Sequence, residues 1–219
     1  MARPSKNTDQ RLIQAAQELL RDSSFSRLGL RQVAARAGVN PGMFHYHFKT
    51  KDQFLRAVLQ DGYEKFFKDF SLRVEGEEKP LDKLRQALFA LARFARDNRR
   101  FGLTLLREVL DGNREVRDFL WKNVPRHGKV MVQLIRRCQK EGSLARMPLP
   151  QAAAFLMPAV AAAAFGVAGL ESQAPSLLAR GLFKGLGALV LSDAAIRKRV
   201  DMALHGLGAD NNGPTRRRA

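Results

Sequence analysis

The sequence has a single cysteine, Cys138, so a disulfide within the chain is excluded. Its first residues also lack the apolar run of a signal peptide. We therefore expect a protein of the reducing cytoplasm. Cys138 stands among cationic residues, and two interpretations stay open: a small buried side chain, or a redox-sensing thiol whose pKa the cations lower.

Acidic residues are also scarce. The chain has 21 Asp and Glu against 38 Lys and Arg, which gives a formal net charge of +17 over 219 residues. Such a surplus favours a polyanionic partner, because cations that neutralise phosphates release the condensed counterions. Nucleic acid is the first candidate, and an anionic membrane surface is the second.

Long uncharged runs are absent except at residues 152–170, a stretch long enough to cross a bilayer. Nine of its residues are alanine, Pro158 interrupts it, and neither end carries the Trp or Tyr that anchors a membrane span. We therefore expect a helix buried within the protein and no membrane partner.

Sustained apolar-polar alternation, the mark of strands, is missing as well, and this predicts an all-α fold. A first helix is expected after Asn7 or Thr8, and a short second one over residues 30–37. Gly38 then suits a left-handed helix end, and Asn40-Pro41 suits the start of the next helix. Two short helices across a three-residue turn outline a helix-turn-helix.

Residues 25–59, FSRLGLRQVAARAGVNPGMFHYHFKTKDQFLRAVL, resemble the DNA-binding segment of the TetR family of transcriptional regulators. The resemblance includes the turn at residues 37–39, the aromatic and histidine run at 46–49, and the Lys-Asp pair at 51–52. It implies a helix-turn-helix DNA-binding domain over residues 1–56 and a helical ligand-binding and dimerisation domain over 57–208. A disordered basic tail is expected at 209–219.

The start of the third helix points into the major groove in such a domain. The candidates for base reading are Arg31, Asn40, Pro41, Gly42 and Met43. Arg31 is equally well suited to a phosphate, so its role stays open between base and backbone. The resemblance implies phosphate contacts for the residues that follow: His45, Tyr46, His47 and Lys51. Gly29 departs from the family, which usually has Ser or Thr there, and it lacks the hydroxyl that would touch phosphate.

In the C-terminal part, helices are expected over residues 80–98, 100–110, 114–140, 150–171 and 175–192, with a break or kink at Pro125. The last two have a small and apolar surface that suits close packing. The resemblance implies that this pair meets its copy as a four-helix bundle in a homodimer. The candidates for that interface are Ala162, Leu178, Gly181, Leu182, Gly185, Leu186 and Leu189.

A ligand cavity in the same domain would be apolar, with an arginine to hold an acidic group. Its candidates are Phe89, Arg93, Phe94, Phe101, Leu105, Met131, Phe155 and Phe165. The same residues are also consistent with an ordinary core.

These patterns favour a sequence-specific regulator, a repressor released from a palindromic operator in double-stranded DNA by a small apolar or amphipathic ligand. The alternative is an architectural nucleic-acid-binding protein with little sequence preference. No catalytic triad, glycine-rich phosphate loop or paired carboxylate is recognisable, so we expect no enzyme and no cofactor. His45 and His47 lie on different sides of a helix, which argues against a metal site.

Overall fold

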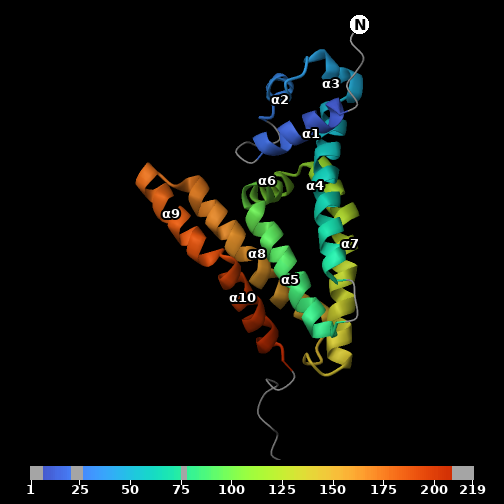
Figure 1. Ribbon diagram of the computed structural model, residues 1–219, viewed down its shortest axis with the longest axis vertical. Helices are drawn as coiled ribbons and strands as arrows, with labels where there is room; N and C mark the ends of the chain where they lie inside the picture. The colour runs from blue at the N-terminus through green and yellow to red at the C-terminus, as the bar shows by residue number, and fades with distance from the viewer. Residues whose placement is uncertain (1–6, 21–26, 75–77, 209–219) are drawn as a thin grey trace, which may run out of the picture. The chain divides into compact units, whose positions relative to one another are not determined.

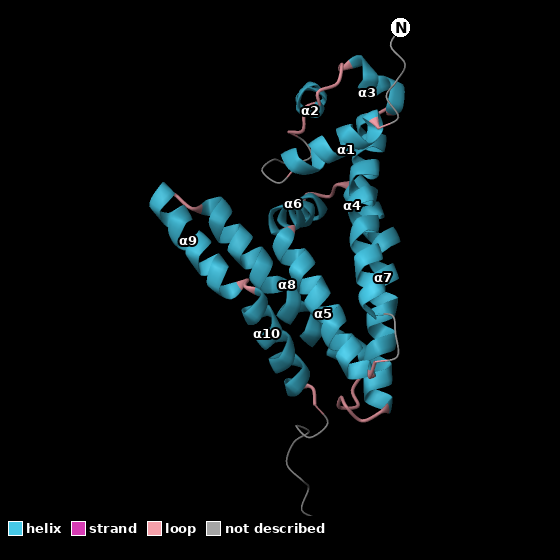
Figure 2. Ribbon diagram, viewed as in Figure 1, coloured by secondary structure: helices cyan, strands magenta, loops and turns pink. Residues whose placement is uncertain are grey.

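The computed structural model describes residues 7–20, 27–74 and 78–208, and within these ranges every regular element is an α-helix (Figure 2). The basic residues before Asn7, Phe25 and the tail 209–219 lie outside the described residues. The helices are α1 Thr8–Leu19, α2 Leu30–Ala37, α3 Gly42–His47, α4 Lys51–Val74, α5 Pro80–Asp97, α6 Arg99–Leu110, α7 Arg114–Lys140, α8 Leu149–Gln173, α9 Leu177–Val190 and α10 Asp193–Gly206. The predicted all-α fold is confirmed.

The chain forms two compact units. Unit 1 comprises Met1–Lys68 and Arg100–Val124, and unit 2 comprises Asp69–Arg99 and Pro125–Ala219. Unit 1 thus adds α6 and the first part of α7 to the three N-terminal helices and most of α4. The functional division at residue 56 stays a prediction, because compactness does not report which residues bind DNA.

Unit 1 is organised around a single apolar core. Apolar side chains of α1 and α2 recur at helical spacing, and they pack together with Phe44 of α3 and Phe54 of α4. Val116 of α7 belongs to the same core, and Phe101 and Leu105 of α6 pack against it. In Figure 1, α1, α2 and α3 gather around the beginning of α4.

The helix α7 runs without a break through Pro125, so of the expected break or kink the break is wrong and the kink stays a prediction. Proline removes the hydrogen bond to the carbonyl four residues earlier, which is that of Trp121. Trp121 is exposed, so water can satisfy this carbonyl. Asn123 stabilises the preceding turn, because its Nδ2 donates to the Phe119 carbonyl at 2.9 Å.

Unit 2 packs α5, α8, α9 and α10 together. Sequence reasoning took α8 and α9 as the last two long helices, and the structure adds α10 after them. Ser192 caps α10, because its Oγ accepts a hydrogen bond from the Ala195 N–H at 3.2 Å. By length and composition, α8 is the one helix of the described chain apolar enough to cross a membrane, and 28% of its most apolar window is buried.

Candidate nucleic-acid interface

The turn between α2 and α3 is built on a left-handed glycine. Gly38 has φ 62° and ψ 40°, and it ends α2 as the sequence predicts. The Nη2 of Arg11, on α1, donates to the carbonyls of Ala37 and Gly38 at 2.6 and 3.2 Å. A guanidinium at a helix C-terminus satisfies orphan carbonyls and opposes the negative end of the helix dipole. Arg11 therefore fixes the turn.

The N-terminus of α3 is exposed and fixed by a side chain. Asn40 Oδ1 accepts a hydrogen bond from the Gly42 N–H at 2.8 Å, and the Asn40 carbonyl accepts one from Met43. Pro41 occupies the N-cap position, one residue later than expected, with helical φ −53°. Asn40, Pro41 and Gly42 are exposed and Met43 is half-buried, so the beginning of this short helix is accessible.

An aromatic cluster attaches α3 to α4. Phe44 is buried, and its ring lies 4.9 Å from that of Phe54 between centroids. Phe48 lies at the same distance from Phe54. Edge-on aromatic pairs of this kind combine apolar burial with favourable ring electrostatics. The inward placement expected for Phe44 and Phe48 thus sets which side of α3 is free.

The predicted phosphate contacts are placed unequally. His45 is exposed, and Tyr46 is 70% exposed, so both side chains are accessible. His47 is half-buried, and its Nε2 is covered with no hydrogen-bond partner among the described residues. A contact from His47 to phosphate therefore requires Nδ1 or a rotation of the ring. Lys51 is half-buried at the first position of α4.

The second helix contributes one further candidate. Arg31 is exposed in the first turn of α2. Gly29 precedes it as N-cap in an extended conformation, φ −86° and ψ 128°, with no side-chain cap. Glycine at position 29, where the family usually has Ser or Thr, therefore leaves the start of α2 intact and removes only the side-chain hydroxyl.

Sequence reasoning missed the cap of α4. Thr50 Oγ1 accepts a hydrogen bond from the Gln53 N–H at 3.1 Å, and the Thr50 carbonyl accepts one from Phe54. The signal was present, since Thr-x-x-Gln is the spacing of a capping box. Thr50 fixes the first turn of α4, where Lys51 stands.

A half-buried acidic group joins α1 to α4. Asp61 accepts hydrogen bonds from Gln10 Nε2 at 3.0 Å and Gln17 Nε2 at 2.8 Å, and Lys65 Nζ lies 2.8 Å away. Partial burial raises the pKa of the Asp61 carboxyl, but the hydrogen bonds from Gln10, Lys65 and Gln17 outweigh it, and the net shift is downward. The ionised form of Asp61 therefore stabilises the attachment of α1.

The helix α7 is joined to α4 within unit 1. The guanidinium of Arg56 pairs with both carboxylate oxygens of Glu115, with Nη2 to Oε1 at 2.7 Å, and it lowers the pKa of Glu115. Tyr63 donates its hydroxyl to the Asn123 carbonyl at 2.6 Å, and the Gln60 and Asn123 amides exchange hydrogen bonds. A displacement of α7 would thus be transmitted to α4.

The predicted dimer residues share one property, a high exposure. Leu178 is 82% exposed and Leu182 is 68% exposed; Ala162, Gly181, Gly185, Leu186 and Leu189 are exposed as well. Side chains added at Gly181 or Gly185 would meet no atom within 4 Å. The structure brings these residues to an uncovered apolar face of α8 and α9, and their role in a dimer stays a prediction.

The predicted ligand residues are divided between the two units, and their role in a cavity stays a prediction. Phe101 and Leu105 pack against the core of unit 1, while Met131 is buried in unit 2. Phe94 is 36% exposed and Phe155 is 49% exposed. Phe89 carries the guanidinium of Arg197 over its ring, at 4.4 Å from the centroid, and that of Arg93 at 5.9 Å; Phe165 is half-buried. None of the eight lines the cavity described below in unit 2.

Cys138 is fully buried, and burial raises the pKa of its thiol. A thiol held in its neutral form reacts slowly. Of the two interpretations, the structure favours the small buried side chain.

Comparisons with known proteins agree with this geometry. Residues 12–58 match the family model described as bacterial regulatory proteins, tetR family. The probable HTH-type transcriptional regulator YttP of Bacillus subtilis is 21% identical over 146 residues, which are 66% of this chain and 70% of YttP. The HTH-type transcriptional repressor Rv3405c of Mycobacterium tuberculosis is 34% identical over 101 residues, 46% of each chain.

Among solved structures, a putative transcriptional regulator from Saccharomonospora viridis in complex with choline has the same fold. Its TM-score is 0.69 at 16% identity, covering 92% of this chain and 97% of that one. The matched segment contains Gly38, the exposed start of α3 and the aromatic cluster that orients it. Residues 12–58 thus form a helix-turn-helix segment of the TetR type, and the chain is similar to bacterial transcriptional regulators of that family.

Proposed function

We propose that this protein is a repressor that binds a palindromic operator as a homodimer in the cytoplasm and leaves it when a small ligand binds the C-terminal domain. The observation that carries the proposal is the exposed N-terminus of α3, fixed by Asn40 and by the turn at Gly38. In helix-turn-helix proteins this end of the second helix meets the base edges. Arg31 and Asn40–Met43 would read bases there.

Phosphate contacts would come from the other end of α3 and from the start of α4. Tyr46 and His45 are exposed, and Lys51 adds a cation to the N-terminal end of the α4 dipole. Such contacts position the domain without reading sequence.

The homodimer is supported by the apolar face of α8 and α9. Large apolar side chains that are this exposed on a soluble protein mark an interaction surface. A two-fold dimer places the same patch of each copy against the other, which is also the symmetry of a palindromic operator. Glycines at positions 181 and 185 would let the paired helices approach closely.

The ligand response is supported by the helices that unit 1 shares with unit 2. The helices α4 and α7 each begin in unit 1 and continue into unit 2, and the Arg56–Glu115 pair joins them beside the DNA-binding helices. A ligand that prefers one arrangement of these helices would change operator affinity by the ratio of its affinities for the two states.

A competition titration tests the proposal against an architectural role. Genomic fragments retained by the protein supply the operator, and unlabelled random DNA is the competitor. We expect the protein to prefer its operator by at least about a thousandfold at physiological salt. Equal displacement by random DNA would instead establish the architectural protein.

Variants assign the contacts. Arg31→Ala should reduce discrimination at one base pair, whereas Tyr46→Phe, His47→Ala and Lys51→Ala should weaken binding to all sequences. Lys51→Ala, which removes a cation, should also reduce the salt slope by about one. Lys68→Ala is the matched control, because it removes an exposed cation about 25 Å along α4 from Lys51. Unchanged operator binding in the first four variants would contradict the proposed interface.

A further inference from the structure

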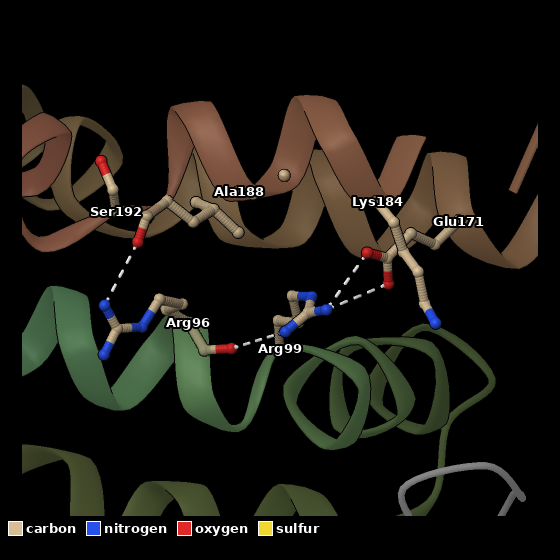
Figure 3. A pocket seen from close by; sticks show the side chains of 8 residues that line it. Arg96, Arg99, Glu171, Lys184, Ala188 and Ser192 are labelled. Atoms are coloured by element: carbon tan, nitrogen blue, oxygen red, sulfur yellow. Dashed lines mark hydrogen bonds and ion pairs between the residues drawn. The ribbon is translucent and has the colours of Figure 1, made fainter. Parts of the chain in front are cut away.

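A cavity of about 330 Å³ lies within unit 2, where the ends of α5 and α8 meet the second half of α9 (Figure 3). Its volume is at the lower end of the range of small-molecule sites. The residues that define it are Arg96, Arg99, Glu171, Lys184, Gly187 and Ala188.

Glycine at position 187 allows α9 to pack closely on α8. A Cβ there would lie 3.0 Å from Val167 Cγ1 and 3.6 Å from Glu171 Oε1. The glycine thus lets the two helices close over the Glu171 carboxylate, whose side chain is 4% exposed. The cavity is therefore a built feature of the helix pair.

Cations outnumber anions in its lining by three to one. The Nη2 of Arg99 donates to both carboxylate oxygens of Glu171, at 3.1 and 3.3 Å. Arg96 is held by Asp97, Asp193 and the Leu191 carbonyl. Both guanidiniums are thus fixed in place by protein groups.

Two donors are left over. The Nε of Arg99 is buried and has no hydrogen-bond partner among the described residues. The ammonium of Lys184, which extends beside Glu171 in Figure 3, has no ion-pair partner within the described part of the chain. A buried unused donor is costly unless a ligand satisfies it.

We propose that this cavity binds a small organic carboxylate with a short apolar tail. The carboxylate would accept a hydrogen bond from Lys184 and, after a rotation of the Arg99 side chain that uncovers its Nε, a second one from Arg99, while the tail would contact Gly187 and Ala188. Guanidinium and ammonium groups form their strongest hydrogen bonds with ionised acceptors. A cationic or neutral ligand would leave the Lys184 ammonium, which has no carboxylate partner among the described residues, without an anion.

The site would act on the helix pair that carries the apolar face. Lys184 and Ala188 stand on α9 between Leu182 and Leu189, so a ligand seated there would change how α9 packs on α8. This consequence rests on the proposed function, whereas binding itself does not.

Calorimetric titration of the full chain without DNA tests the site. The probe is hexanoate; hexanol is its neutral counterpart, choline a cation, and inorganic phosphate an anion without a tail. We expect hexanoate to bind more tightly than the other three. Lys184→Ala should weaken hexanoate about fivefold, the upper range for an exposed charge pair. Lys198→Ala removes an exposed cation of α10 outside the cavity and should change nothing.

Glu171→Gln should act in the opposite direction and tighten hexanoate binding about fivefold, because it frees Arg99 from its carboxylate. Any one of the following outcomes would overturn the site. Hexanol, choline or phosphate could bind with the same affinity as hexanoate, or hexanoate could fail to bind at millimolar concentration. Lys184→Ala and Lys198→Ala could also have equal effects on hexanoate affinity. Because these titrations contain no DNA, their failure leaves operator preference, the test of the proposed function, unaffected.

Discussion

The turn that presents α3 depends on two residues that a double-mutant cycle can separate. Gly38→Ala forces a side chain into the left-handed region, which costs about 1–2 kcal/mol. Its Cβ would also lie 3.1 Å from Arg11 Nη2 and push the guanidinium away from the Ala37 carbonyl. Charge-assisted hydrogen bonds contribute about 1.5–3 kcal/mol, and we reduce this to about 1 kcal/mol because the pair is partly exposed.

The expected free energies of unfolding follow from these terms. Gly38→Ala should cost about 2–3 kcal/mol in the natural chain and about 1–2 kcal/mol when Arg11 is already alanine, because only the backbone term remains. The coupling between the two positions is then about 1 kcal/mol, within the usual range for residues in contact. Urea unfolding followed by circular dichroism, at one protein concentration, measures all four variants.

Gly112 provides the matched control. It has φ 80° in the turn between α6 and α7, and a Cβ there would meet nothing within 4 Å. Gly112→Ala should therefore show the backbone cost alone and no coupling to Arg11. If Gly38→Ala had the same cost with and without Arg11, Arg11 would not fix the turn. A neutral Gly38→Ala would show that the left-handed conformation is wrong.

Three further changes test other parts of the molecule. Leu182→Glu places a charge on the apolar face, so the protein should be a monomer by light scattering and should lose operator binding. Met202→Glu changes a residue that is 64% exposed on α10 and should leave the dimer intact. A dimeric Leu182→Glu protein would refute this interface. Burial lowers the pKa of His127, so the folded state favours the neutral ring, and stability is full above the ordinary pKa of about 6.5 and falls as the pH drops through the lower folded pKa. His127→Gln should flatten this loss in urea midpoints between about pH 6.5 and 5, and an unchanged slope would assign it to other groups. The Cys138 thiol should react with a disulfide reagent only after urea is added, and rapid reaction in the folded protein would contradict its burial.

Local signals in the sequence were sufficient for the helix-turn-helix. Gly38 predicted the left-handed end of α2, and the spacing of Leu12, Ile13 and Ala16 predicted the buried face of α1. These features depend on residues a few positions apart, where propensity and periodicity are informative. The position of Arg11 against Ala37 was not predictable, because it depends on how α1 crosses α2.

Features that depend on distant residues were missed. The cavity brings Arg99 against Glu171, 72 positions later, and no periodicity reports such a pairing. Seven of the eight expected ligand residues were chosen for apolarity, which equally describes core positions such as Met131. Pro125 was expected to break α7, but the residue whose carbonyl it deprives of a partner is exposed to water. The start of α10 was also missed, although Ser192 is a typical N-cap residue, because the many charged residues that follow it weaken the apolar periodicity of the helix.

The composition of α8 suits both a membrane span and a partner helix, and the distribution of its exposed residues distinguishes the two. Exposure recurs at every fourth position, at Ala154, Pro158, Ala162, Gly166 and Leu170, which form a stripe that winds slowly around the helix. The remaining surface of α8 includes the buried residues Leu156, Ala164 and Glu171, and the helix packs against α5, α9 and α10. Glu171 is ion-paired with Arg99. A lone span would present apolar groups on all sides to lipid and would not hold an ion pair at its end. One exposed apolar stripe, continued on α9 by Leu182 and Leu186, is the kind of surface that a second helix pair covers, and this is why we assign the apolar run to the proposed dimer.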